Sequence, residues 1–366
     1  MSESRPLKVG LAGFGYAGAT LHAPLIGCTP GLHLVAVASH NPLRVEAELG
    51  PEVEVHPQAL DLARRADIDL LVIATPNDTH AQLAQAALTT GQHVVIDKPF
   101  ALNVAQALPL LQQARASQRL LSVFHNRRWD ADFLTARSLI EQGRLGRLTE
   151  ARLLFDRFRP TVRERWREGG GPGAGLWNDL APHLLDQALQ LFGLPVALQA
   201  DLMTLRSGGL SDDAFECRLR YESGLRVTLA ASMLTALPGA RFAIHGTQGS
   251  WVKHGLDVQE DALKAGLRPG IDHPQDWGFD PLPGRLALAQ ADGSVLTQDL
   301  ANERGRWPAY YAGVRDAILG AGRNPVPAED ALQVLWLQDL GRSSARLRQE
   351  LAVTAIPMNA QQESMT

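Results

Sequence analysis

Two hydrophobic patterns alternate over the first 125 residues of the chain. Short runs of Val, Ile and Leu without polar alternation suit strands that are buried on both faces of a parallel sheet. The runs between them have the apolar spacing of helices. Strands are expected at residues 7–12, 32–38, 68–74, 93–96 and 120–124, and helices at residues 17–25, 42–49, 58–65, 79–90 and 104–117. Repeated strand–helix–strand units predict a doubly wound parallel sheet over residues 1–126.

A different pattern begins after residue 126. Longer strands separated by turn residues are typical of an antiparallel sheet with helices on one side. Strands are expected at residues 148–155, 198–205, 214–221, 225–234 and 241–245, and helices at residues 130–142, 179–191, 309–319 and 329–351. Residues 127–356 are therefore predicted to form an α+β domain with a large, mostly antiparallel open sheet. The polar residues 357–366 are expected to form a frayed tail.

One strand of the second domain has two largely apolar faces. In it, Val227, Leu229 and Ala231 alternate with Thr228 and Ala230. One face can cover helices, whereas the other would stay exposed in a monomer. We therefore expect a homodimer, or a dimer of dimers, built on this sheet.

Composition and charge narrow the class of partner. The 366 residues carry a net charge of −4, so no basic surplus favours nucleic acid or an anionic membrane. There is no apolar run of about 18 residues, the length that spans a bilayer, and the N-terminus lacks a secretory pattern. Cys28 and Cys217 show neither a disulfide framework nor metal-ligand spacing. The sequence predicts a cytoplasmic protein that binds no nucleic acid, membrane or metal.

A glycine motif follows the first strand and opens the first helix. Its residues are Gly13, Phe14, Gly15, Tyr16, Ala17 and Gly18, which match G-x-G-x-x-G. Such glycines permit a tight turn, close approach of the backbone to a pyrophosphate, and close packing of helix on strand. The helix N-terminus adds free N–H groups. The motif predicts a Rossmann domain that binds a dinucleotide at these six residues, and a glycine-rich turn without a ligand is the alternative.

The end of the second strand bears on the choice of cofactor. An acidic residue there would bind the ribose 2′-hydroxyl of NAD, but the strand is followed by Ser39, His40, Asn41 and Arg44. Without a carboxylate a 2′-phosphate is not repelled, and hydroxyl or guanidinium groups can bind it. We expect these four residues to contact the cofactor and favour NADP, with NAD possible. A solvated position of Arg44 on the helix surface is the alternative.

Two further strands end in polar residues at the edge that faces the cofactor crevice of an open α/β sheet. Thr75, Pro76 and Asn77 follow the third strand, and Asp97 and Lys98 follow the fourth. For the first three, direct contact with the cofactor and a simple turn are equally compatible with the sequence. Lys98 is placed where nicotinamide and substrate should meet, although a lysine at a strand end is usually a solvated charge.

Asp179, His183 and Asp186 are spaced so that they share one face of a predicted helix. Asp179 and His183 form a candidate acid/base pair, because a carboxylate can orient an imidazole that moves a proton near neutral pH. Asp179 has an alternative as the helix N-cap, because Pro182 fits best in a first helical turn. That alternative does not account for His183.

Together these motifs resemble the Gfo/Idh/MocA family, the group of glucose–fructose oxidoreductase and inositol dehydrogenase. The resemblance covers nearly the whole chain and rests on residues 13–18, 75–77, 97–99 and 179–186. Members of the family use NAD or NADP to oxidise a sugar or cyclitol hydroxyl, or to reduce the ketone. They commonly dimerise through the open face of the second sheet.

The resemblance also implies roles for individual residues. The lysine of the family's E-K-P motif matches Lys98, and the aspartate and histidine of its second-domain helix match Asp179 and His183. Two positions depart from the family pattern. Asp97 stands where glutamate is usual, and Ala181 where glycine is frequent.

A narrower similarity connects residues 124–130 and Trp166 with a bacterial subgroup that includes NADP-dependent scyllo-inositol dehydrogenases. On this basis, we expect His80, Asn126 and the residues at the strand ends, including Asp97 and Lys98, to bind the cofactor. Asn126, Trp129 and Trp166 are expected to bind the substrate together with the catalytic residues.

The sequence therefore predicts an NAD(P)-dependent oxidoreductase that transfers a hydride between a nicotinamide cofactor and a secondary alcohol or ketone of a cyclitol or sugar-like substrate. The catalytic residues would be His183, which takes the hydroxyl proton, Asp179, which orients the substrate or the histidine, and Lys98, which holds the reacting oxygen. The alternative is a regulatory protein of the same fold that binds dinucleotide or sugar without turnover. Specificity is expected to come from the loops 156–175 and 268–282.

Overall fold

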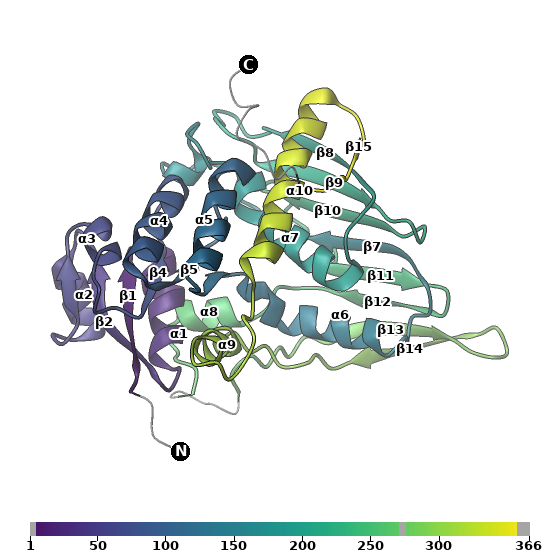
Figure 1. Cartoon of the computed structure of the whole chain (residues 1–366). Helices are drawn as coiled ribbons and strands as arrows, with labels where there is room; N and C mark the ends of the chain where they lie inside the picture. The colour runs from purple at the N-terminus through teal and green to yellow at the C-terminus, as the bar shows by residue number, and fades with distance from the viewer. Residues whose placement is uncertain (1–4, 271–275, 357–366) are drawn as a thin grey trace.

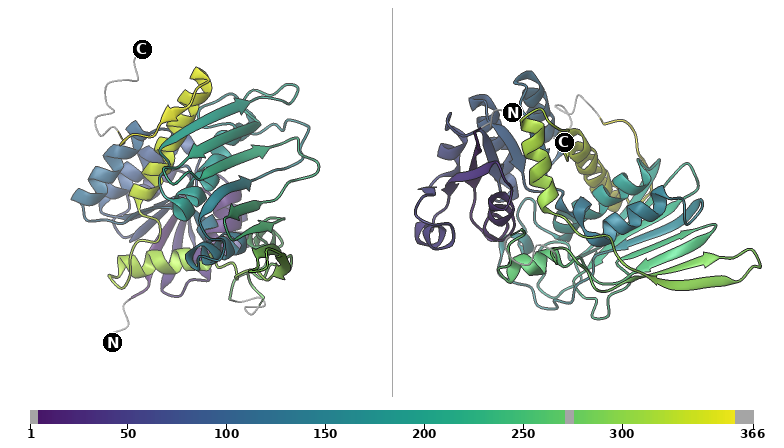
Figure 2. Two further views of the ribbon diagram at one scale, coloured as in Figure 1. Left: turned by 90° about the vertical axis from the view of Figure 1, so that its right-hand side faces the viewer. Right: turned by 90° about the horizontal axis from the view of Figure 1, so that it is seen from below.

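The computed structural model describes residues 5–270 and 276–356 and contains two β-sheets side by side (Figure 1). Helices fill the space between the sheets, and none of the described helices lies on the far face of the larger sheet (Figure 2). This arrangement confirms the predicted α/β class. The predicted tail, residues 357–366, lies outside the described residues. No described helix is long and apolar enough to cross a membrane.

The first sheet is parallel throughout, as predicted. Its strands are β1 (Leu7–Ala12), β2 (Leu32–Ala38), β3 (Glu54–His56), β4 (Leu70–Ile73), β5 (His93–Ile96) and β6 (Leu121–Val123). They lie in the order β3-β2-β1-β4-β5-β6. The order reverses between β1 and β4, and at such a switch point open α/β sheets bind ligands beyond the carboxyl ends of their strands.

Helices cover both faces of this sheet. They are α1 (Ala23–Gly27), α2 (Pro42–Leu49), α3 (Ala59–Ala63), α4 (His80–Thr90) and α5 (Val104–Ala116). A π-helical segment, Gly18–His22, precedes α1, so the helix predicted at residues 17–25 is present with a locally widened turn. The four residues of β4 are fully buried, which explains its unbroken apolar run.

The second sheet is mostly antiparallel, as predicted. Its strands are β7 (Leu148–Leu154), β8 (Ala197–Met203), β9 (Ala214–Arg220), β10 (Arg226–Ser232), β11 (Phe242–Gly246), β12 (Gly249–Lys253), β13 (Gly284–Ala289), β14 (Val295–Leu300) and β15 (Leu351–Ala352). Their order is β14-β13-β12-β11-β7-β10-β9-β8-β15. β7 and β10 run parallel, and the other pairs run antiparallel.

The remaining helices join the two sheets. They are α6 (Ala131–Glu141), α7 (Leu176–Phe192), α8 (Gln259–Lys264), α9 (Pro308–Ile318) and α10 (Ala328–Leu347). α6, α7 and α10 cover the face of the second sheet that is turned toward the first sheet (Figures 1 and 2). Tyr310, Tyr311 and Leu332, from α9 and α10, are buried in the hydrophobic core of the first sheet. The chain therefore returns to the first sheet after completing most of the second, and the domain boundaries drawn from the sequence remain predictions.

Helix α7 starts earlier than the sequence suggests. It begins at Leu176 with Gly175 as its N-cap, and Pro182 lies inside it. The alternative in which Asp179 caps the helix is therefore wrong. Leu180 and Leu184 are buried in the second core, and this packing outweighs the backbone hydrogen bond that Pro182 removes.

The bare face of the second sheet is mixed rather than apolar. Thr228 and Ala230 point outward from β10 and are half-buried. Thr228 is paired in register with Arg152 of β7, which forms a 2.7 Å ion pair with Glu150. The two faces of β10 are as the sequence predicts, but the neighbouring strand β7 adds charges to the bare face of the sheet. Association through this sheet remains a prediction.

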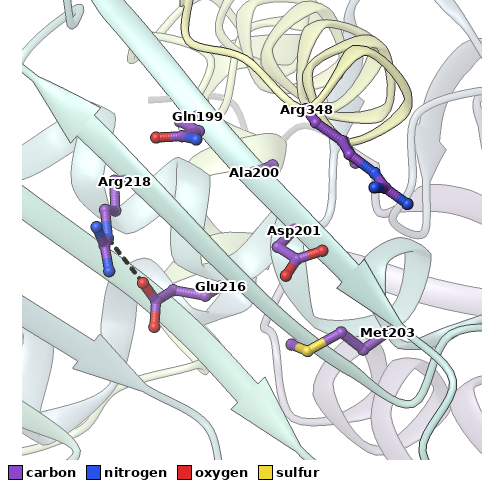
Figure 3. A pocket seen from close by; sticks show the side chains of 8 residues that line it. Gln199, Ala200, Asp201, Met203, Glu216, Arg218 and Arg348 are labelled. Atoms are coloured by element: carbon purple, nitrogen blue, oxygen red, sulfur yellow. Dashed lines mark hydrogen bonds and ion pairs between the residues drawn. The ribbon is translucent and has the colours of Figure 1, made fainter.

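A hollow of about 650 Å³ lies where β8 and β9 meet the end of α10. Its polar lining includes Gln199, Asp201, Glu216, Arg218 and Arg348 (Figure 3). None of the site residues predicted from the sequence lines it. The residues with candidate chemistry lie instead at the carboxyl edge of the first sheet.

Candidate functional site

The glycine motif forms the turn from β1 into the first helix, beside the switch point. Gly13 has a φ of +100°, and a Cβ there would lie 2.6 Å from the Ala74 carbonyl oxygen. A Cβ at Gly18 would clash with the Gly13 carbonyl. Gly15 is different, because a Cβ there would meet nothing within 4 Å. Close packing within the protein explains why positions 13 and 18 require glycine. The open space at Gly15 fits a pyrophosphate that binds close to the backbone.

We expect Gly15→Ala to weaken cofactor binding without lowering the melting temperature. The added methyl group would enter the open space, and crowding of this kind costs about 1–3 kcal/mol. The dissociation constant of NADP, measured by calorimetric titration, should rise about tenfold or more. Gly27→Ala in α1 is the matched control, because a Cβ at Gly27 also meets nothing within 4 Å. Unchanged affinity in Gly15→Ala would contradict a pyrophosphate site at this loop.

Polar groups after β2 stand beside the same loop. The Asn41 side chain caps α2 by accepting the Arg44 N–H at 3.1 Å, and the Asn41 N–H donates to the Ser39 hydroxyl. The Arg44 guanidinium donates to the Phe14 carbonyl at 3.3 Å and lies 5.4 Å from the centre of the Phe14 ring. Arg44 is exposed on α2, where it forms a 2.7 Å ion pair with Glu48. Its guanidinium nevertheless contacts the glycine loop at Phe14, so both alternatives for Arg44 stay open, and His40 is exposed.

The residues after β4 are largely engaged within the protein. The His80 ring lies between the carbonyl oxygens of Pro99 and Thr75, at 2.9 and 3.0 Å, and is 1% exposed. The Asn77 amide donates to the Gly173 carbonyl at 3.2 Å. His80 therefore joins the loops after β4 and β5, and its expected contact with the cofactor stays a prediction. The Thr75 hydroxyl lies 2.6 Å from that of Thr79, and Pro76 is exposed.

Lys98 connects the two sheets at the predicted site. It follows β5, and its Nζ donates to Asp179 of α7, at 2.9 Å to Oδ1 and 2.7 Å to the backbone carbonyl. Burial alone would raise the pKa of Asp179, but the charges of Lys98, Arg167 and Arg157 outweigh it and hold that pKa well below its ordinary value. Asp179 is therefore ionised at neutral pH.

Asp97 is held from the opposite side by groups that the sequence did not suggest. Its Oδ1 accepts the Lys98 N–H at 2.8 Å, and its Oδ2 lies 3.9 Å from Nε2 of His22. His22 belongs to the π-helical segment, and its Nδ1 lies 2.6 Å from the Tyr311 hydroxyl of α9. Asp97 thus fixes the backbone at Lys98, and its expected contact with the cofactor stays a prediction.

His183 lies one turn of α7 beyond Asp179 and is 6% exposed. Burial, followed by the positive charges of Lys98 and Arg127, lowers its pKa well below the ordinary value, so the imidazole is neutral at pH 7. Its Nδ1 is buried and has no hydrogen-bond partner among residues 5–270 and 276–356. The Asp179 carboxylate is bound to Lys98, and no described contact joins it to His183. Of the two roles expected for Asp179, orienting the histidine or the substrate, no hydrogen bond among the described residues supports the first, and the second stays a prediction.

Asp186, on the same face of α7, has a structural partner. Arg128 donates to it through Nε at 2.9 Å and Nη2 at 2.6 Å, and Asp186 is 2% exposed. Arg128 also donates to Asp330 of α10 at 3.0 Å. The third member of the predicted helical face thus joins α7 to its neighbours and is not free for catalysis.

The three residues expected at the substrate behave differently. Trp166 is 43% exposed and lines a hollow with Lys98 and Asp179. Asn126 is 5% exposed, and its amide has no hydrogen-bond partner among the described residues. Trp129 packs against the first core, with its ring 5.7 Å from that of Tyr310. Trp166 therefore lies at the hollow beside Lys98 and Asp179, Trp129 has a packing role, and the substrate contacts of all three residues stay predictions.

Two narrow hollows meet at Arg167, Gly175 and Asp179. One of them is also lined by Asn77, Lys98, Pro99, Trp166 and Asn178. Sequence reasoning did not assign Arg157, Arg167 or Asn178 to the site. The only signal was the excess of arginine in residues 156–175, which does not reveal where the side chains point.

Comparisons with known proteins agree with this geometry. Residues 7–125 match a model described as an oxidoreductase family with an NAD-binding Rossmann fold. Residues 133–252 match a model of the GFO/IDH/MocA C-terminal domain. The chain belongs to the Gfo/Idh/MocA family of oxidoreductases. The predicted family and enzyme class are confirmed, so the chain is an NAD(P)-dependent dehydrogenase or reductase of CH–OH groups.

Relatives of this Gfo/Idh/MocA enzyme match nearly its full length. The uncharacterized oxidoreductase YdgJ of Escherichia coli (strain K12) is 50% identical over 348 residues, which cover 95% of this chain and 99% of YdgJ. The scyllo-inositol 2-dehydrogenase (NADP(+)) IolW of Bacillus subtilis (strain 168) is 32% identical over 93% of this chain and 94% of its own. Among solved structures, the YPO2259 protein of Yersinia pestis superposes with a TM-score of 0.91 at 48% identity, over 96% of this chain and 99% of that one.

Proposed function

We propose that this enzyme oxidises a secondary alcohol of a cyclitol or sugar with NADP. The observation that carries the proposal is the contact of Lys98 with Asp179 across the two sheets, with a neutral, buried His183 one helical turn away. A nicotinamide cofactor bound along residues 13–18 supplies the hydride acceptor. Similarity to IolW, whose name specifies scyllo-inositol and NADP(+), supports both the substrate class and the cofactor.

Each residue of the site has a distinct part. The Lys98 ammonium holds the reacting hydroxyl oxygen and stabilises the negative charge that develops on it. The imidazole of His183 accepts the hydroxyl proton, and we assign this to Nε2 because Nδ1 is enclosed by protein. Asp179 fixes the ammonium through its 2.9 Å contact. Asn126 and Trp166 position the substrate ring.

The substrate class is tested by mixing the enzyme and NADP with a panel of cyclitols and sugars and following the absorbance of the reduced cofactor. Reduction with at least one polyol supports the proposal. Tight binding of NADP without reduction across the whole panel would contradict it and favour a binding protein.

We expect NADP to be preferred over NAD, because Arg44 lies over the glycine loop and no carboxylate ends β2. The measurement is kcat/KM for both cofactors with one substrate. A tenfold advantage of NAD, or about 1.4 kcal/mol of transition-state stabilisation, would contradict the assignment.

Arg44→Ala should lower kcat/KM for NADP more than for NAD if the guanidinium binds the 2′-phosphate. Glu48→Gln is the matched control, because it removes the carboxylate that Arg44 contacts at 2.7 Å and should leave the preference for NADP intact. Equal losses for both cofactors in Arg44→Ala would assign the phosphate to another group.

A further inference from the structure

Arg157 and Arg167, from the stretch 156–175, lie beside the Lys98–Asp179 contact, and Arg159 is near enough for the charge of Asp179 to act on it. We call Arg157, Arg159 and Arg167 the arginine cluster. Arg157 Nη1 lies 3.9 Å from Asp179 Oδ2, and Arg167 lines both hollows. Within the described part of the chain, none of the three guanidiniums donates a hydrogen bond to another group. A half-buried cation that donates no hydrogen bond loses part of its solvation free energy, and a bound ligand that accepts its hydrogen bonds would restore it.

The nearby carboxylates are already bound. Asp179 is held by Lys98. Three other acids line the hollows. Glu168 accepts hydrogen bonds from Arg165 and Arg206, and Asp213 accepts one from Arg206. Asp212 accepts the Trp177 N–H. The cluster therefore leaves an excess of positive charge beside the site of chemistry.

Two of the guanidiniums lie over aromatic rings. Arg157 lies 5.0 Å from the centre of the Phe155 ring, and Arg167 lies 5.1 Å from that of Trp166. A guanidinium stacked by its face keeps its N–H edges free, and those edges match two oxygens of a carboxylate or phosphate. Stacking also reduces the conformational freedom that a bound anion would otherwise have to remove.

Neighbouring arginine charges in this stretch repel one another. Burial and the neighbouring charges of Arg163 and Arg165 lower the pKa of Arg159. Burial likewise lowers the pKa of Arg157, with Arg159 adding to the effect. An anion between these side chains would relieve this repulsion.

We propose that the arginine cluster is an anion subsite, so that the substrate is a polyol or sugar bearing a carboxylate or a phosphate. This inference rests on the proposed function, since it assigns the anion to the molecule whose hydroxyl is oxidised. The anionic group would bind at Arg157, Arg159 and Arg167 while the reacting hydroxyl meets Lys98. Neutral cyclitols would lack this contact and would be the poorer substrates.

The test compares matched neutral and acidic compounds at saturating NADP. Glucose, glucuronate and glucose 6-phosphate share a ring and differ in the anionic group, and scyllo-inositol is a further neutral compound. We expect kcat/KM for one acidic member to exceed that for glucose by about tenfold or more, the scale of one charge-assisted hydrogen bond. The comparison of glucuronate with glucose 6-phosphate shows whether the site prefers a carboxylate or a phosphate. Added salt should reduce the preference.

Substitution locates the subsite. Arg167→Gln should reduce the ratio of acidic to neutral kcat/KM by about tenfold. Arg152→Gln is the matched control, because Arg152 is an exposed arginine on the bare face of the second sheet and its loss should leave the ratio unchanged. Melting temperatures of both variants show that they are folded.

Binding is measured separately from turnover by titrating each acid into the enzyme–NADP complex in a calorimeter. If neutral compounds are oxidised while the acids neither bind nor react better, the subsite is refuted and the proposed function stands. If an acid binds and loses affinity in Arg167→Gln but no compound of the panel is oxidised, the cluster binds anions and the proposed function fails. An acidic preference that survives Arg167→Gln and Arg157→Gln would also overturn the proposal.

Discussion

Lys98→Met is expected to lower kcat by about 10²–10³-fold, the cost of removing one donor to a developing oxyanion. Methionine preserves much of the length of the side chain and removes its charge. The Asp179 carboxylate would lose its 2.9 Å partner, and the reacting oxygen would lose the ammonium. The measurement is steady-state kcat with the best substrate of the panel.

The control for this variant is Lys8→Met. Lys8 is exposed on β1 of the same sheet, at the end opposite the crevice, so its loss changes the net charge equally. Its kcat should match that of the wild type. A kcat of Lys98→Met within about threefold of the wild type would remove Lys98 from the chemistry, because a donor to the oxyanion is worth far more.

His183→Asn is expected to lower kcat by about 10²–10⁴-fold, the usual contribution of a positioned general base. Asparagine fills much of the space of the imidazole but does not accept the proton. His33→Asn is the control, because His33 is exposed on β2. If His183 were structural only, the variant would melt at a lower temperature while turnover per folded molecule stayed near that of the wild type, and that result would refute the assignment.

The low pKa of His183 determines how kcat/KM for alcohol oxidation depends on pH. Protonation of the base stops it from accepting the hydroxyl proton, so oxidation slows as the pH falls through its pKa. Burial and the charge of Lys98 hold that pKa well below 6.5. We therefore expect kcat/KM for alcohol oxidation to stay level from pH 8 down to 6.5. If kcat/KM instead falls toward acid pH with a midpoint at or above pH 6.5, the assignment of His183 as the base would be contradicted.

The parallel half of the fold could be predicted because its strands are enclosed on both sides. β4 is buried at every position, so its sequence is an unbroken apolar run. β14 lies at the edge of the second sheet, is exposed at every position except the half-buried Leu300, and has no such run. The strands β3, β12, β13, β14 and β15 were missed because they are short or weakly buried.

The site could be predicted only in part, since its decisive contacts are not local. Glycines and strand ends indicate the crevice, but nothing in the sequence shows that Asp179 contacts Lys98 rather than His183. Pro182 suggested a helix start that tertiary packing overrides. Local arginine content at residues 156–175 was visible, but only the packing of that stretch against α7 brings Arg167 to the hollows and Arg157 to within 3.9 Å of Asp179.

The most direct test of a single catalytic unit between β5 and α7 is the rate of cofactor reduction in one turnover, measured for Lys98→Met, His183→Asn and the double variant. Groups that act on the same oxygen and proton give strongly non-additive losses. We predict that the double variant is slower than the worse single variant by less than about tenfold. A double variant whose fold-loss in rate equals the product of the two single losses would contradict the account. Hydride transfer at the wild-type rate in either single variant would also contradict it.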